Sequence, residues 1–228
     1  MECYRRVRLD GDRAANPLTG VPGRNTWPES GPEAGLQSEG SLMTKPIERR
    51  TARLTLRCWG DQDRAPFAAM NADPEVMRYF AALWTEDASN AAIDTWLSQF
   101  AAQGWSNWAV EITHTGEFIG FIGLSVPKRV LPFSPCVEIG WRLGRSFWHQ
   151  GYATEGAREA LRVGFETVGL DEIVSFTTLT NLPSRAVMTR LGMRDTHADF
   201  DHPGVPEGHP LRPHCLYKLS SADWHRQA

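Results

Sequence analysis

The sequence predicts one domain of mixed α/β structure in which helices flank a sheet. Two stretches carry this prediction. "RLTLRCW" at residues 53–59 alternates apolar and polar side chains, as a half-buried strand does, and "SFWHQGYATEGAREALRVGF" at 146–165 runs from a glycine turn into an amphipathic helix. The expected order is strand, helices, hairpin, strand, helix, strand, helix and two strands, which excludes a repeat protein and a doubly wound nucleotide-binding fold.

The segment 1–42 differs in composition from the rest of the chain. Glycine and proline make up about a quarter of it, while valine and leucine are sparse and show no period. Such a segment buries too little apolar surface to offset the entropy of ordering, so we expect it to be disordered. A start at Met43 would leave a self-sufficient domain at 43–228. The segment is then either an upstream extension of the reading frame or an interaction arm.

The first half of the domain is expected to contain a strand, three helices and a hairpin. Asp73 and Pro74 suit the cap and the first position of the second helix, and Gly116 suits the hairpin turn. In order, the expected elements are a strand at 53–59, helices at 61–72, 73–80 and 85–103, and strands at 105–112 and 118–126.

The second half follows a proline-rich loop. Within the helix after the glycine turn, apolar and small residues recur at spacings of three and four, which indicates a face that packs on the core. The expected elements are a strand at 136–143, a helix at 154–168, a strand at 172–179, a helix at 181–193, and strands near 194–200 and 214–219.

Composition limits the partners and the location. A net charge of −3 over 228 residues and a pI near 6.2 give no general attraction to nucleic acid or to an anionic membrane. No stretch approaches the roughly 18 apolar residues that span a bilayer. The 4 cysteines are scattered without a CxxC pair, which argues against a zinc or disulfide framework and suits a reducing cytoplasm. The histidines and aspartates between 199 and 214 fit no standard zinc spacing, so no metal is expected.

The three stretches "RLTLRCWGDQDRAPFAAMNADPEVMRYF", "VEIGWRLGRSFWHQGYATEGA" and "TNLPSRAVMTRLGM" occur in this order within residues 47–219. Together they resemble the GNAT superfamily of acyl-CoA-dependent N-acyltransferases, specifically its RimJ/RimL-like branch of ribosomal-protein N-acetyltransferases. The resemblance implies a central mixed, mostly antiparallel sheet with a splayed strand pair, flanked by helices. It also implies transfer of an acetyl group from acetyl-CoA to a primary amine by direct attack on the thioester.

The glycine turn gains a role from this resemblance. Gly151 alone is typical either of a plain strand-to-helix turn or of a helix N-terminus that a phosphate approaches closely. The resemblance favours the second reading, with main-chain contacts from Trp141 and Leu143 to the pantetheine arm. Gly151 and Ala153 match the pyrophosphate signature, but Trp148 stands where Arg or Gln is usual, which removes one possible charge partner. The residues expected around the pyrophosphate are Gln150, Gly151, Tyr152, Ala153 and Thr154.

The expected catalytic residues are Glu138 and Ser184. Because the amine must lose a proton before it attacks, a carboxylate beside it is the natural aid, and Glu138 is the candidate. Its alternative is a partly buried glutamate paired with an arginine. Asn181 caps the late helix and, by resemblance, lies beside pantetheine, while Ser184 lies near the thioester sulfur or serves only the cap. Met188 occupies the position where many members have a tyrosine acid. The leaving thiolate is therefore expected to take its proton from Ser184, from water or from no dedicated group, since the thiol pKa is low.

The acceptor site is expected to include Trp84 and Phe133, because both lie outside strands, and His202 and His214, because the resemblance places their loop beside the acceptor pocket. Core packing or loop ordering is the alternative for each. The acceptor is a protein N-terminus or a small-molecule amine, and homodimers are common in this branch. Two other hypotheses are a catalytically inactive acyl-CoA-binding sensor or interaction module, which Met188 motivates, and a structural domain without cofactor.

Overall fold

The computed structural model describes residues 45–227, so the disorder predicted for 1–42 lies outside the described residues. In this part of the chain one sheet has the strand order β1-β2-β3-β4-β5-β6-β9-β7, and β8 pairs with β9. The strands are β1 (Arg49–Arg50), β2 (Leu54–Arg57), β3 (Asn107–Ile112), β4 (Phe118–Ser125), β5 (Glu138–Leu143), β6 (Glu172–Thr178), β7 (Arg194–Asp195), β8 (Phe200–Asp201) and β9 (Pro213–Ser220).

Every strand pair is antiparallel except β5 and β6, which run parallel. These two strands share a single registered pair, Glu138 with Val174, whereas β4 and β5 share six. The predicted mixed, mostly antiparallel sheet with a splayed strand pair is therefore confirmed.

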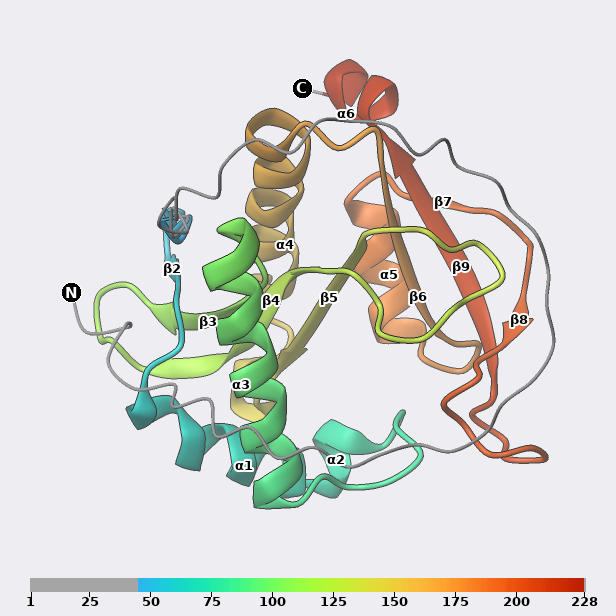
Figure 1. Cartoon of the computed structure of the whole chain (residues 1–228). Helices are drawn as coiled ribbons and strands as arrows, with labels where there is room; N and C mark the ends of the chain where they lie inside the picture. The colour runs from blue at the N-terminus through green and yellow to red at the C-terminus, as the bar shows by residue number, and fades with distance from the viewer. Residues whose placement is uncertain (1–44, 228) are drawn as a thin grey trace, which may run out of the picture. The chain divides into compact units, whose positions relative to one another are not determined.

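Helices cover both faces of the sheet (Figure 1). On one face Phe67 of α1 and Trp96 of α3 contact Phe121 of β4, with ring centroids 6.1 and 4.9 Å away. On the other face α4 lies over β2 and β4. The helices are α1 (Arg64–Ala72), α2 (Pro74–Met77), α3 (Glu86–Gln103), α4 (Tyr152–Arg162), α5 (Leu182–Arg190) and α6 (Ser221–Gln227).

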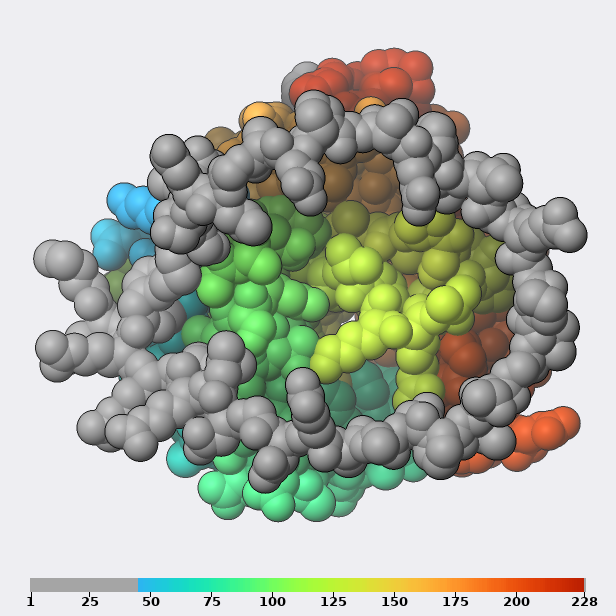
Figure 2. Space-filling model, in the orientation of Figure 1, coloured from blue at the N-terminus to red at the C-terminus, as the bar shows by residue number. Residues whose placement is uncertain are grey.

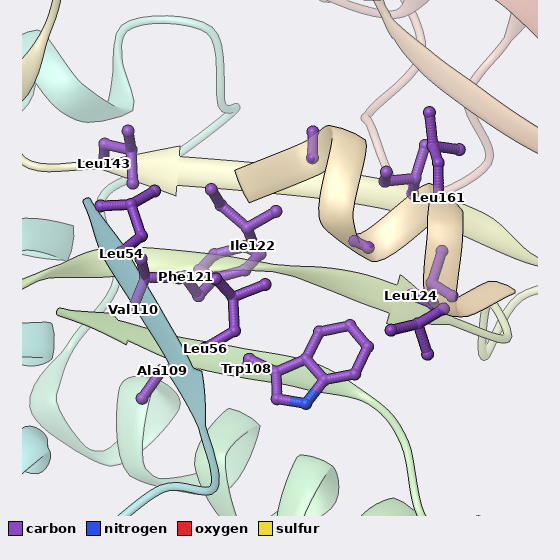
Figure 3. Close-up of a cluster of buried hydrophobic side chains, with 14 of the residues drawn as sticks. Leu54, Leu56, Trp108, Ala109, Val110, Phe121, Ile122, Leu124, Leu143 and Leu161 are labelled. Carbon is purple, nitrogen blue, oxygen red and sulfur yellow. The ribbon is translucent and has the colours of Figure 1, made fainter. Parts of the chain in front are cut away.

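The close fit of α4 on the sheet depends on small residues. Ala157 and Ala160 are fully buried, and a Cβ added to Gly156 would lie 2.4 Å from Cδ1 of Ile122. Leu161 completes this buried face above Ile122 and Leu124 of β4 (Figure 3). The core-facing stripe predicted for this helix is confirmed, and it holds the N-terminus of α4 rigidly against the end of β5.

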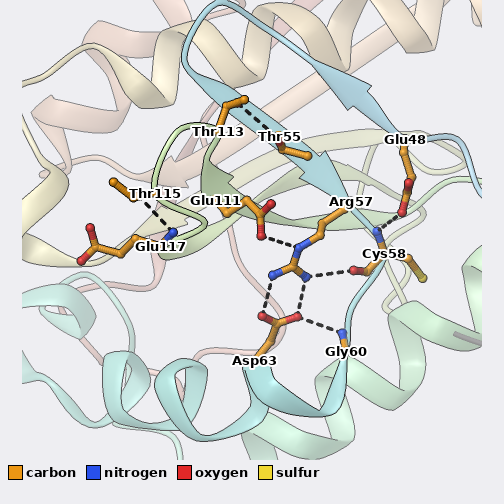
Figure 4. A network of polar contacts seen from close by, with 10 residues as sticks. All are labelled: Glu48, Thr55, Arg57, Cys58, Gly60, Asp63, Glu111, Thr113, Thr115 and Glu117. Atoms are coloured by element: carbon orange, nitrogen blue, oxygen red, sulfur yellow. Dashed lines mark hydrogen bonds and ion pairs between the residues drawn. The ribbon is translucent and has the colours of Figure 1, made fainter. Parts of the chain in front are cut away.

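A buried ion-pair network fixes the start of α1 against the sheet (Figure 4). The Arg57 guanidinium donates to both Asp63 carboxylate oxygens at 2.7 and 2.9 Å, and its Nε donates to Glu111 at 2.6 Å. The hydrogen bonds to Asp63 are the largest cause of the raised pKa of Arg57. Asp63 also accepts the Gly60 N–H at 2.8 Å, so this carboxylate joins β2, β3 and the turn before α1.

Several boundaries differ from the sequence predictions. Helix α4 begins at Tyr152, and residues Val163–Val168 continue it as a π-helix that ends at Gly169 with φ +78°. The predicted strand near 194–200 is two short strands, β7 and β8. Strand β1 and helix α6 were not predicted. No helix among residues 45–227 has the length and apolar character needed to cross a membrane.

Candidate functional site

A cavity of about 1500 Å³ lies where β5 and β6 separate. Its walls come from the segment between α2 and α3, from α3, β5, β6 and α5, and from the turn before α4. In Figure 2 the surface is hollowed beside the loop that joins β4 to β5, drawn in yellow-green. The sequence-predicted turn and central strand therefore meet at one cavity.

Strand β5 presents different groups to different sides of the cavity. The Ser175 hydroxyl donates to the Ile139 carbonyl at 3.0 Å, and no registered pair with β6 follows Glu138. Because main-chain groups alternate in direction along a strand, Trp141 directs its N–H and C=O into the gap. Glu138, Gly140 and Arg142 are alternate residues of β5 and therefore share one face of the sheet. All three line the cavity.

Glu138 has no hydrogen-bond or ion-pair partner among residues 45–227, so the alternative of a Glu–Arg pair is excluded for this part of the chain. Cavity water reaches part of its surface, yet protein surrounds the carboxylate. This burial raises its pKa from 4.5 to about 8. Gly140, the next residue on this face, leaves the space beside the carboxylate open, because a Cβ there would meet no atom closer than 3.7 Å.

The turn before α4 presents backbone N–H groups to the cavity. Gly151 has φ +82°, which an L side chain rarely adopts, and the first α-helical bond runs from Glu155 N to Gly151 O. The N–H groups of the first turn, from Tyr152 to Thr154, are thus without helical acceptors at the positive end of the helix dipole. This arrangement suits an anion such as a pyrophosphate.

Arg53 supplies a cation at this turn, and the sequence reasoning missed it. Its guanidinium donates to Glu155 at 2.6 Å and to the Gln150 carbonyl at 2.9 Å, and it lies 4.5 Å over the Tyr152 ring. A Cβ on Gly151 would lie 3.4 Å from its Nη2. A guanidinium, ion-paired with Glu155, therefore lies at the turn although Trp148 replaces the usual Arg or Gln.

Trp148 serves the structure of the same turn. Its indole N–H donates to the Leu143 carbonyl at 2.8 Å. That carbonyl is thereby engaged, so Leu143 keeps fewer main-chain groups for a ligand than Trp141 does. His149, with φ +60°, is a strained non-glycine residue within the turn.

Helix α5 brings Asn181 and Ser184 to the cavity. The Asn181 side chain accepts the Ser184 N–H at 3.3 Å and donates to Thr177 Oγ1 at 2.9 Å, so the predicted cap is confirmed. The Ser184 hydroxyl donates to no described residue. Met188, one turn later, is 1% exposed and packs in the core, not on the cavity wall.

Comparison with known families matches residues 53–194, more than half of the chain, to the acetyltransferase (GNAT) domain. The chain belongs to the GNAT acetyltransferase family. It is 35% identical over 189 residues to the FsC-acetyl coenzyme A-N(2)-transacetylase of Aspergillus fumigatus, with 77% of each chain covered.

Solved structures show the same fold. A GNAT-family acetyltransferase from Bacillus anthracis superposes with a TM-score of 0.64 at 23% identity, covering 77% of this chain and 99% of that one. RimJ of Mycobacterium smegmatis, solved in complex with CoA-disulfide, gives a TM-score of 0.59 at 20% identity, covering 75% and 83%. At these identities the likeness concerns the fold alone.

Three of the four residues predicted for the acceptor site of this GNAT protein line the cavity. Trp84 packs edge-on against Phe67, and its ring also lies 4.4 Å from the Arg142 guanidinium. His202 and His214 stack with ring centroids 4.8 Å apart. Burial lowers the pKa of both imidazoles, and that of His202, which also faces the other ring, falls to about 4.

Two predicted residues do not line the cavity. Phe133 packs against Phe176 and Phe200, with centroids 5.8 and 5.0 Å away, because the loop needs an apolar anchor on the sheet. The Gln150 side chain turns back to donate to the Ser146 carbonyl at 2.8 Å. Phe133 therefore does not line the cavity, and its contact with an acceptor stays a prediction. For Gln150, only the backbone remains a candidate for donor contact.

Arg142 is a cavity residue that the sequence reasoning missed. It is 7% exposed, yet no Asp or Glu of residues 45–227 lies within ion-pair distance of it. Its Nη1 donates to the Asn71 side chain at 2.6 Å, and burial lowers its pKa to about 9. Within the described residues no group of three or more His, Cys, Asp or Glu side chains is arranged to hold a metal ion.

Proposed function

We propose that this GNAT protein transfers an acetyl group from acetyl-CoA to a primary amine by direct attack of the amine on the thioester. The observation that carries the proposal is a single cavity that joins an unpaired carboxylate, Glu138, to the splayed main chain of β5 and to the N–H groups of the Gly151 turn. The name of the Aspergillus relative, which specifies acetyl coenzyme A and a nitrogen acceptor, supports the same reaction class.

The donor fits the chain's own groups. Tyr152, Ala153 and Thr154 offer main-chain N–H groups to the pyrophosphate, and Arg53 adds a charge. The unpaired main chain of Trp141 suits the amides of the pantetheine arm, as an added strand would. Asn181, the N-cap residue of α5, also lines the cavity. Bound acetyl-CoA supplies the activated acetyl group.

Glu138 prepares the amine. An alkylammonium has a pKa near 10.4 and an N-terminal ammonium near 7.7–8.0, so the base must take a proton from a weak acid. A carboxylate of pKa about 8 is far better matched to this task than one of pKa 4.5. The proton passes from the amine to the Glu138 carboxylate, directly or through one water.

Ser184 is the proposed donor of a proton to the leaving thiolate. Its hydroxyl lines the cavity and donates to no described residue. A thiol with a pKa near 8.5 is already a good leaving group, so the contribution of Ser184 is expected to be smaller than that of Glu138. Met188 cannot take this role, since its thioether carries no proton.

The acceptor is a peptide N-terminus or a small-molecule amine that enters beside Trp84, His202 and His214. The relative's name, which specifies an N(2) acceptor, favours a small molecule for that protein. The RimJ/RimL-like branch, the homodimer and the cytoplasmic location remain predictions from the sequence.

The test is thiol release by the full chain with acetyl-CoA and a panel of amines and peptides, with mass spectrometry of the product. We expect amine-dependent release that Glu138→Gln reduces strongly. Glu75→Gln is the matched control, because Glu75 also lines the cavity but is half exposed and paired with Arg78 at 3.8 Å. Binding of acetyl-CoA without release for any amine would instead support the inactive sensor.

A further inference from the structure

The guanidinium of Arg142 is held rigidly in the cavity with part of its hydrogen-bonding capacity unused. Phe80 and Trp84 lie 4.1 and 4.4 Å from its Cζ, and Asn71 accepts only from Nη1. Nε is buried without an acceptor, and Nη2 donates to no described residue. A buried donor left without an acceptor destabilises a fold, so the chain retains an unfavourable arrangement at this position.

The unused nitrogens have a defined geometry. Nε and Nη2 lie on one edge of the planar guanidinium; Nε is enclosed by protein, so Nη2 is the donor that a carboxylate reaches from the cavity. The aromatic rings stack on the guanidinium and leave its charge in place. Since no carboxylate among residues 45–227 approaches this edge, its natural partner is a planar oxyanion from outside the described chain.

Arg142 and Glu138 lie on the same face of β5, four residues apart, with Gly140 midway between them. Across the strand pair they face Phe121 and Ser125, on the sheet face that α1 and α3 cover. Four residues of a strand span about 13 Å between Cα atoms. Glu138 and Arg142 therefore meet a ligand at separate positions along one face of β5, with the open space at Gly140 between them.

We propose that the acceptor carries a carboxylate as well as its amine, that Arg142 binds this carboxylate, and that the two groups stand several bonds apart. This inference rests on the proposed function, because it assigns the amine to Glu138. Gly140 provides the floor on which the connecting chain lies, since a side chain there would fill the space between the two charged ends. Both a small amino acid with a distant carboxylate and a peptide N-terminus followed by an acidic residue have this chemistry.

The experiment compares ε-aminocaproate with its amide, which has the same amine and length but no charge. The full chain with acetyl-CoA should use the carboxylate with kcat/KM about 10- to 100-fold higher, as expected for a hydrogen bond to a charged group. Glycine, whose amine and carboxylate share one carbon, should be a poor acceptor. Equal use of ε-aminocaproate and its amide would overturn the proposal.

Variants separate recognition from folding. Arg142→Gln should abolish the preference by lowering kcat/KM for the carboxylate while leaving that for the amide within a few fold, and Arg142→Lys should restore part of the preference. Arg78→Gln, which removes another cavity arginine, should keep the full preference. Loss of activity toward both acceptors in Arg142→Lys as well as in Arg142→Gln would assign Arg142 a structural role and contradict the proposal.

Two further experiments identify the source of the carboxylate and test the anion site without requiring acetyl transfer. A peptide with glutamate near its free N-terminus, compared with its glutamine counterpart, distinguishes a peptide acceptor from a small one. Calorimetric binding of ε-acetamidocaproate, which needs no transfer, should be weakened at least 10-fold by Arg142→Gln. If the chain binds this compound but releases no thiol with any amine, the transferase proposal fails and the anion site stands; if neither protein binds it, the anion site is refuted.

Discussion

Replacing Glu138 with glutamine should stabilise the fold at alkaline pH while removing most of the transferase activity. The carboxylate is buried without a partner, and its pKa is raised from 4.5 to about 8 by that burial alone. Glutamine has nearly the same shape but carries no charge. The gain in stability and the loss of activity therefore both result from removing the charged form of the Glu138 carboxylate.

The sign of the stability effect follows from the raised pKa. Below about pH 4.5 Glu138 is protonated in the folded and the unfolded chain, so its burial has no charge-dependent effect. Between pH 4.5 and about pH 8 the unfolded chain releases a proton that the folded chain retains, and the free energy of unfolding falls as pH rises. Above about pH 8 the Glu138 carboxylate is ionised in both states, and its effect on the free energy of unfolding no longer changes with pH.

The size of the effect has an upper bound. At about 1.36 kcal/mol for each pKa unit, the rise from 4.5 to about 8 corresponds to at most about 5 kcal/mol. Because cavity water reaches part of the side chain, we expect Glu138→Gln to gain about 1–3 kcal/mol at pH 9. The gain should vanish near pH 4.5.

The activity should change in the opposite direction. In the wild type the ionised fraction of Glu138 rises about tenfold for each pH unit below about 8, and kcat/KM should rise with it. Loss of a general base lowers the rate by about 10²- to 10⁴-fold, and the corresponding limb of the pH profile should disappear. Dividing the profile of the variant by that of the wild type on the same amine removes the titration of the amine itself.

The assay is urea unfolding at several pH values together with a pH–rate profile by thiol release. Glu75→Gln is the control and should change neither quantity in this pattern, because Glu75 is half exposed. A Glu138→Gln protein that is no more stable at pH 9 than the wild type would refute the burial argument. Unchanged kcat/KM across pH 6 to 9 would refute the role as base.

Two further predictions concern the ion pairs of the fold and the donor. Asp63→Asn removes the buried partner of Arg57 and should lower the free energy of unfolding by about 3–5 kcal/mol, whereas Asp94→Asn, in an exposed pair, should lower it by at most about 1 kcal/mol; equal losses would contradict the network in Figure 4. Arg53→Gln should weaken acetyl-CoA binding and reduce its salt dependence, measured by calorimetry, while Arg64→Gln, remote from the cavity, should not; identical affinities would remove Arg53 from the donor site.

The sequence was informative where local pattern and chemistry coincide. The strand at β2, the glycine turn before α4 and the Asn181 cap each depend on a few neighbouring residues, and the structure has all three, although β2 is buried on both faces and not half-buried as its alternation predicts. Glu138 was chosen for its residue type and position in the family pattern. Its unpaired burial could not be predicted, because that depends on which side chains the sheet brings close to it.

The remaining site residues depend on contacts distant in sequence. Arg53 reaches the turn from the bend before β2, nearly one hundred residues earlier in the chain, and nothing in "RLTLRCW" indicates this contact. Arg142 carries no sequence signal of its role, because its burial against Phe80 and Trp84 depends on residues that lie far from it in the chain. Phe133 was assigned to the cavity because it lies in a loop, but loops also need anchors, and its ring fills that role.

The most direct test of the account is calorimetric titration of the full chain with acetyl-CoA, in the wild type, in Gly151→Trp and in Gly116→Trp. Both glycines have positive φ, +82° and +71°, but Gly116 lies in the hairpin between β3 and β4 with no atom near its Cβ position. We predict binding by the wild type and by Gly116→Trp, and loss of binding by Gly151→Trp with the circular dichroism spectrum unchanged. Wild-type affinity in Gly151→Trp, or no binding by the wild type, would contradict a donor site at this turn.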